Sequence, residues 1–97
     1  MDKPISKAKL QQRLKVDVEF TGEFIGANRK FCVPGNEVVR RRVVRQSKHG
    51  MVCVLLGGPK EGQETSLTWS GCEAVERDDS VILVNSENGE EFLKITF

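Results

Sequence analysis

The sequence predicts an all-β domain, a small antiparallel β-barrel or sandwich of about six strands. Three observations support this fold class. Apolar and polar residues alternate in 14–21, β-rich runs near the C-terminus flank a turn, and turn-forming residues recur at intervals of about 8–12 residues. A chain of 97 residues is long enough for one hydrophobic core. We therefore expect residues 14–97 to form a single all-β domain.

Residues 1–13 form a separate basic N-terminal arm in this prediction. Their apolar residues, together with Leu14, make only a weak stripe at helical spacing. Two alternatives therefore stay open for the arm, a short basic helix or disorder. In both cases its cations provide a loose electrostatic attraction for an anionic partner. The cations to which we assign this role are Lys7, Lys9 and Arg13 of the arm and Lys15, which follows it.

Two strands are expected next, at 14–21 and at 29–33. The alternation in 14–21 directs every second side chain inward, as in a half-buried strand. The inward set is Leu14, Val16, Val18 and Phe20. A turn at 26–28 precedes the second strand, and Pro34-Gly35 ends it.

Residues 38–45 have the sequence VVRRRVVR, the most unusual segment of the chain. Four β-branched valines without a common helical stripe favour a strand. On a regular strand each face carries two valines and two arginines, so neither face is purely apolar. A β-bulge in the triple arginine, or a strand that protrudes beyond the sheet, resolves this conflict. Because burying an unpaired guanidinium is costly, we expect all these arginines at the surface or against acids.

The remaining strands belong to the C-terminal part of the chain. They are predicted at 50–56, 66–75, 81–84 and 92–97. The second of these is expected to break at Gly71, and a polar turn at 76–79 precedes the third. The last two form a hairpin, because the Asn88-Gly89 pair between them suits a turn with positive φ.

Charge is distributed unevenly along the chain. Residues 1–60 contain 13 Lys and Arg against 5 Asp and Glu, a net charge of +8. Residues 61–97 contain 2 Lys and Arg against 9 Asp and Glu, a net charge of −7. Such asymmetry indicates either an electrostatic partner for one half or mutual neutralisation of the two halves.

The first hypothesis for function is a small binding module that contacts a polyanion, most plausibly DNA or RNA. Arginine suits this role because its planar fork bonds phosphate oxygens in pairs. The candidate nucleic-acid-binding residues are Arg29, Lys30, Arg40, Arg41, Arg42, Arg45 and Lys48. The competing interpretation is structural, with the same arginines paired to acids of the 61–97 half across the sheet.

Two aromatic residues are candidates for stacking on bases or for a protein interface. Phe31 follows two cations in the run NRKF, a pattern that suits stacking on an exposed base. Trp69 is a candidate anchor for a protein partner, because large rings carry much interface energy. For both residues the alternative is burial in the core.

The second hypothesis is a small regulator or inhibitor, of a phage or plasmid type, that binds a host protein or nucleoprotein complex. Its basic edge would contact an acidic protein surface, or its acidic half a basic one. Phe24 and Phe97 join Trp69 as candidate anchors in this case. An exposed edge strand is also a route to a homodimer.

Several chemistries lack their sequence patterns. Cys32, Cys53 and Cys72 are widely spaced without a CxxC motif, and His49 is the only histidine, so we expect no metal site. No nucleophile and base are recognisable together, and no phosphate-loop motif is complete. We therefore expect no enzymatic activity and no cofactor. The polar N-terminus and the short apolar runs lead us to expect a cytoplasmic protein without membrane contact.

Overall fold

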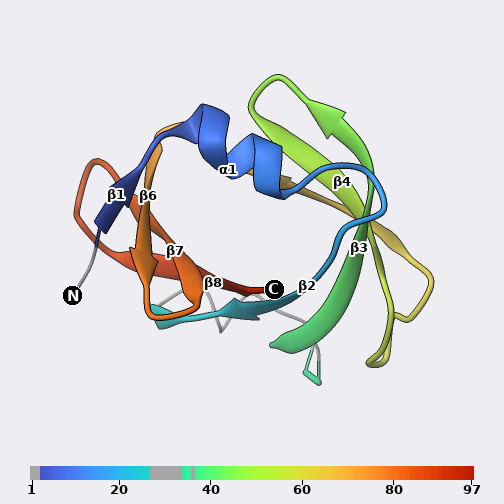
Figure 1. Cartoon of the computed structure of the whole chain (residues 1–97). Coiled ribbons are helices and arrows are strands. Elements are labelled where there is room, and N and C mark those ends of the chain that lie inside the picture. Colours follow the sequence, from blue (N-terminus) through green and yellow to red (C-terminus); the bar gives the residue numbers. More distant parts are fainter. Residues whose placement is uncertain (1–2, 27–33, 36) are drawn as a thin grey trace.

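The computed structural model describes residues 3–26, 34–35 and 37–97, and in these ranges it contains one antiparallel sheet and one helix (Figure 1). The predicted all-β class is confirmed, with eight strands in the sheet. In chain order the elements are β1 (Lys3–Ile5), α1 (Lys7–Arg13), β2 (Glu19–Phe24), β3 (Val38–Ser47), β4 (Gly50–Leu55), β5 (Glu64–Thr68), β6 (Cys72–Arg77), β7 (Ser80–Asn85) and β8 (Glu91–Thr96).

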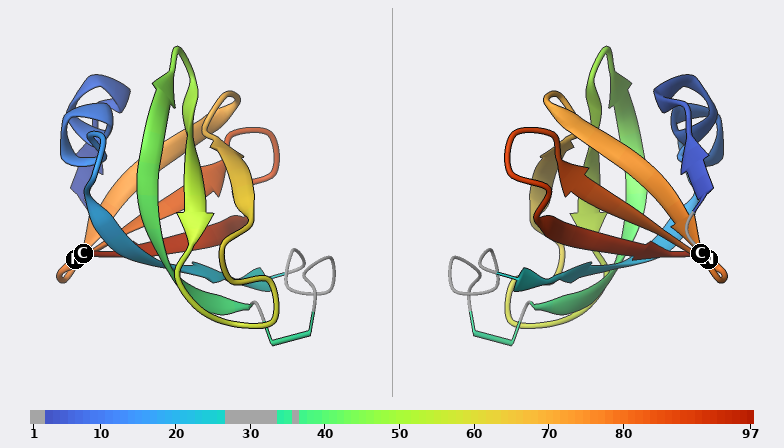
Figure 2. Two further views of the ribbon diagram at one scale, coloured as in Figure 1. Left: turned by 90° about the vertical axis from the view of Figure 1, so that its right-hand side faces the viewer. Right: turned by 90° about the vertical axis from the view of Figure 1, so that its left-hand side faces the viewer.

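The strands have the order β1-β6-β7-β8-β2-β3-β4-β5, so β1 and β5 are the two edges of the sheet. Figure 2 shows that the sheet is strongly curved, so its inner face surrounds the core. Residues 69–71 connect the edge strand β5 to β6, which lies next to the opposite edge. Gly71 has a φ of 75° at this corner, a left-handed conformation that glycine adopts readily. The predicted break at Gly71 is confirmed.

The helix α1 packs across the curved sheet, between the β1–β6 side and the β3–β4 side (Figure 1). Ser6 caps its first turn, since the Ser6 hydroxyl accepts a hydrogen bond from the Lys9 backbone N–H at 3.1 Å. At its other end, the Gln46 side-chain amide donates to the carbonyl oxygens of Gln11 at 2.7 Å and Leu14 at 2.9 Å. Of the two alternatives for the N-terminal arm, the helix is therefore the one observed.

The strand predicted at 14–21 begins later, at Glu19, so its predicted start is wrong. Leu14 is the C-cap of α1 and contributes to the core from the end of the helix. Asp17 has a φ of 74°, a left-handed conformation that aspartate tolerates, and it turns the chain before β2. Val16 is consequently 51% exposed, although the alternation predicted that it faces inward.

The other predicted strands fall close to observed ones. The C-terminal hairpin is formed by β7 and β8, and Gly89 in its turn has a φ of 71°. β4 matches the strand predicted at 50–56 within one residue. The strand predicted at 29–33 lies outside the described residues, and β1 was not predicted.

One apolar cluster joins α1 to the inner face of the sheet. Its members are Leu10, Leu14, Phe20, Val43, Met51, Cys53, Trp69, Cys72, Ala74, Val81, Leu83, Leu93 and Ile95. Leu10 and Leu14 are fully buried, so the helix is part of this core rather than an appendage. Within the described ranges, no helix has the length and apolar character needed to cross a membrane.

We predict that Leu10→Ala lowers the free energy of unfolding by about 2–5 kcal/mol, because it leaves a cavity where α1 meets the sheet. Urea denaturation followed by circular dichroism measures this change. The matched control is Lys9→Ala, an exposed position of the same helix, which we expect to change stability by less than about 0.5 kcal/mol. Equal, small effects of both substitutions would show that α1 does not contribute to the core.

Candidate functional site

The three consecutive arginines point in alternate directions from β3. Side chains on a strand alternate between its two faces, and Val39 and Val43 are both buried against the inside of the sheet. Arg41 lies between them in sequence and therefore also faces inward, where it is only 3% exposed. Arg40 and Arg42 face outward and are exposed.

A β-bulge follows the triple arginine. The register between β3 and β4 shifts between Val43 and Arg45, which leaves Val44 as the extra residue. The bulge was predicted within the arginines, and this position is wrong by a few residues. Because of the bulge, Arg45 lies on the outer face. Regular alternation from Val43 would have directed it inward.

The guanidinium of Arg41 reaches across the interior of the curved sheet, from β2 to β5. Its Nη1 atom donates a hydrogen bond to Thr65 Oγ1 at 2.8 Å and lies 3.9 Å from Cys53 Sγ. The ring of Phe24 lies 5.5 Å from Cζ, within range of a cation–π contact. Gly22 leaves space for the side chain, because a Cβ at this position would lie 2.9 Å from Arg41 Nε.

The expectation that every arginine of 38–45 is exposed or paired with an acid is wrong for Arg41. It is buried, its Nε has no hydrogen-bond partner, and no ion pair among the described residues includes it. Arg41 is therefore not available to a phosphate on the outer surface. The burial of Val39 and Val43 on the same face fixes its direction, despite the cost of desolvating the charge.

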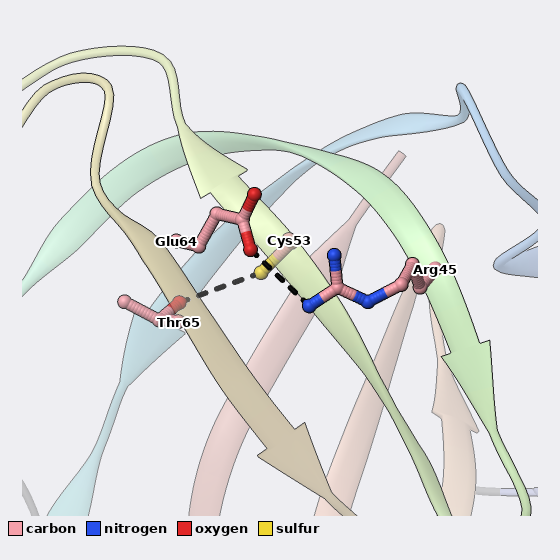
Figure 3. A network of polar contacts seen from close by, with 4 residues as sticks. All are labelled: Arg45, Cys53, Glu64 and Thr65. Carbon is pink, nitrogen blue, oxygen red and sulfur yellow. Dashed lines mark hydrogen bonds and ion pairs between the residues drawn. The ribbon is translucent and has the colours of Figure 1, made fainter.

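Two outward arginines form exposed ion pairs. Arg40 Nε lies 3.8 Å from Glu19 Oε1, and Arg40 Nη1 donates to Thr21 Oγ1 at 3.2 Å. Arg45 Nη2 contacts Glu64 Oε1 at 3.2 Å across β4, as Figure 3 shows. The same view shows the contact of 3.5 Å between Cys53 Sγ and Thr65 Oγ1. Exposed pairs of this kind contribute only about 0–1 kcal/mol each, so they leave both arginines able to exchange partners.

Three other cations near β3 have no acidic partner among the described residues. Arg42 is exposed on the outer face of β3, and Lys48 is exposed in the turn between β3 and β4. Lys15 lies beside the end of β3, where it lines a groove with Gln46 and residues of α1. We call Lys15, Arg40, Arg42, Arg45 and Lys48 the basic surface.

Valines lie beside the arginines of the basic surface. Val54 is the direct neighbour of Arg42 on β4, and Val52 is the neighbour of Arg45. Both are half-buried, and Val38 at the start of β3 is 54% exposed. The outer face of β3 and β4 is therefore a mixed cationic and aliphatic surface.

Among the other predicted site residues, the structure describes the aromatic residues Trp69 and Phe97. Trp69 is 2% exposed in the core, so its core alternative holds and it is not a surface anchor. Phe97 is 38% exposed and stacks under the guanidinium of Arg13, with Cζ 4.2 Å from the ring centroid. Arg29, Lys30 and Phe31 lie outside the described residues.

The cysteines of the described part are buried thiols. Burial raises the pKa of the Cys72 thiol, and the nearby charge of Lys7 opposes this shift. Cys53 contributes to the core, and Cys32 lies outside the described residues. No cluster of three or more His, Cys, Asp and Glu residues in ranges 3–26, 34–35 and 37–97 is arranged to hold a metal ion.

Two residues that matter for the site were not identified from the sequence. Gly22 and Thr65 accommodate the Arg41 side chain, one by its lack of a Cβ and the other by its hydroxyl. A glycine inside a strand often marks a close approach of another group, which was an available signal for Gly22. Thr65 carries no such signal.

Comparisons with known proteins do not add a relationship. No family model, no curated protein and no solved structure matches this chain. The functional argument therefore depends on the residues themselves.

We predict that Arg41→Met raises the free energy of unfolding by about 1–4 kcal/mol, because an apolar side chain of similar length removes a buried charge that no acid compensates. Chemical denaturation monitored by Trp69 fluorescence measures the change. The matched control is Arg42→Met on the outer face of β3, with an expected effect below about 0.5 kcal/mol. A loss of stability in Arg41→Met would contradict this interpretation and show that the guanidinium is a net stabilising group.

Proposed function

We propose that the chain is a small non-enzymatic module that binds a polyanion, namely nucleic acid, through the basic surface. The observation that supports this proposal is that three exposed cations in or next to β3, Lys15, Arg42 and Lys48, have no acidic partners in the described part. Unpaired, solvated cations gain from phosphate contacts because they lose no internal ion pair and release counterions from the nucleic acid. The proposal places the chain in the cytoplasm.

The proposed contacts are to phosphates rather than to bases. The described residues of the basic surface are aliphatic and cationic, and Trp69 is in the core rather than beside them. A surface without rings offers no platform on which unpaired bases stack. It also lacks a projecting helix that enters a groove, because α1 is packed against the sheet. We therefore expect binding that depends weakly on base sequence and strongly on salt.

Ion pairs limit the charge of the basic surface. Glu19 and Glu64 partly neutralise Arg40 and Arg45, each in an exposed pair. Binding of a phosphate close to either arginine competes with a carboxylate that is already present. We therefore assign the main contacts to Arg42 and Lys48 and a secondary role to the paired arginines.

The second candidate function is the binding of an acidic protein surface. The observation that favours it is the row of aliphatic side chains beside the arginines, in particular the exposed Val38. Protein interfaces combine an apolar centre with a polar rim, and arginine is enriched in them. A homodimer through an edge strand also stays a prediction. β5 is the candidate edge, because it lacks the Lys and Pro residues that β1 contains.

Fluorescence anisotropy with labelled single- and double-stranded DNA and RNA at several salt concentrations tests the proposed function. We predict that log affinity falls linearly with log salt, and that Arg42→Gln combined with Lys48→Gln reduces the slope by about 1–2. The matched control is Lys60→Gln, an exposed lysine in the loop after β4, at the opposite end of that strand from Lys48.

We expect the Lys60→Gln control to retain the wild-type slope. Absence of binding to all four oligonucleotides at low salt would contradict the nucleic-acid proposal. In that case the valine-containing outer face and an acidic protein partner would become the leading candidate.

A further inference from the structure

The edge strand β5 has backbone hydrogen-bonding groups that point away from the sheet. Among the described strands it pairs with β4 alone, at the margin of the curved sheet (Figure 2). Directly after β5, the Trp69 backbone N–H donates to the His49 carbonyl oxygen at 2.9 Å. Hydrogen-bonded positions alternate along an antiparallel ladder, so the odd-numbered residues of β5 direct their N–H and C=O groups toward β4 and the even-numbered residues direct theirs away. The even-numbered residues are Glu64, Ser66 and Thr68, and all three are exposed.

The two edges of the sheet differ in how they are protected against pairing. Native edge strands commonly carry Pro, Lys or a bulge, or are very short, and each of these features prevents the addition of another strand. The edge strand β1 has three residues and contains Lys3 and Pro4. β5 has the sequence ETSLT, without Pro or Lys, and its register with β4 is regular throughout. β5 is therefore the edge that suits the addition of a strand.

The backbone of β5 is complementary to that of a second copy in antiparallel pairing. With a two-fold axis at Ser66, this residue lies opposite the partner's Ser66, and Glu64 lies opposite the partner's Thr68. All of these residues direct their N–H and C=O groups to the open edge, so the groups of the two copies bond to one another. No like charges lie directly opposite each other in this register.

The inward side chains of β5 also fit this arrangement. Thr65 and Leu67 point toward the interior and are half-buried, and Leu67 packs against the core. In the two-fold register Leu67 lies opposite the partner's Thr65, at a position without ladder hydrogen bonds, where side chains come closest. Pairing therefore covers part of the surface that these two side chains leave exposed at the edge.

From these observations we propose that the chain forms a two-fold symmetric dimer by antiparallel pairing of β5 with β5 of a second copy, centred on Ser66. This contact is closed, because it occupies the open β5 edges of both copies. The two-fold axis is perpendicular to the sheet, so the outer faces of β3 and β4 of both copies lie on the same side of one continuous sheet. A polyanion on that side meets two basic surfaces, and only this consequence rests on the proposed function.

Sedimentation equilibrium of the chain without nucleic acid tests the pairing. Between about 1 μM and about 500 μM we expect a reversible monomer–dimer equilibrium with a Kd of roughly 10–100 μM, because one strand pair is a small interface. Ser66→Lys and Ser66→Glu each place like charges opposite each other at the two-fold axis. We expect each substitution alone to raise the Kd about fivefold.

An equimolar mixture of the two variants makes the test specific for the register. In the mixed dimer a lysine lies opposite a glutamate, so we expect a Kd at or below the wild-type value. The matched control is Ser47→Lys, which adds the same charge at an exposed position at the end of β3 and is expected to retain the wild-type Kd. Circular dichroism of each variant verifies that the sheet is intact.

The mass of a single chain at every concentration would overturn the proposal and leave the β5 edge to an extended segment of a different protein. Dimers of unchanged Kd in both Ser66 variants would also overturn it, as would a mixture that associates no more tightly than either variant alone. Nucleic acid is absent from all these measurements. Their failure is therefore distinguishable from a failure of nucleic-acid binding in the anisotropy experiment.

Discussion

The alternation of side chains along β3 is the constraint on which both the interior and the outer surface depend. Val39 and Val43 are required in the core, and a strand places every second residue on the same side. Arg41 is therefore directed inward and Arg40 and Arg42 outward. A shift of the strand by one residue would bury two arginines and expose both valines, which is far more costly than burying one arginine.

Other parts of the fold accommodate this buried charge. Gly22 on β2 leaves room for Nε, and Thr65 on the edge strand β5 accepts a hydrogen bond from Nη1. The side chain thereby links strands that are not direct neighbours in the sheet. After the arginines, the bulge at Val44 restores the outward direction of Arg45. β3 consequently provides one buried cation, Arg41, on its inner face and a row of cations on its outer face.

The charge asymmetry of the sequence is only partly reproduced as contacts between the two halves. Arg13 pairs with Glu76 and Arg45 with Glu64, which fits mutual neutralisation. Arg40 instead pairs with Glu19, an acid of its own half, and Arg42 has no acidic partner among the described residues. Mutual neutralisation of the two halves therefore describes Arg13 and Arg45, whereas Arg42 stays available to an external anionic partner.

Periodicity and turn chemistry predicted the fold class, the break at Gly71 and the C-terminal hairpin, because local sequence determines these features. The strand start at 14 was wrong, since alternation cannot distinguish a strand from the end of a helix followed by a turn at Asp17. The burial of Arg41 was missed because the sequence pattern does not show which pair of valines is buried, and the groups that accommodate the guanidinium, Gly22 and Thr65, are distant in sequence. General costs of burying charge argued against it, and tertiary packing prevailed.

The most direct test of this account is the hydrogen-exchange rate of the arginine Nε–H groups, measured by NMR on ¹⁵N-labelled protein with assignments from single substitutions. The account predicts that Arg41 Nε–H exchanges much more slowly than those of Arg40 and Arg42, because only Arg41 is enclosed by the sheet. Equal, fast exchange at all three positions would contradict the alternation of β3 and place Arg41 with the other arginines at the surface.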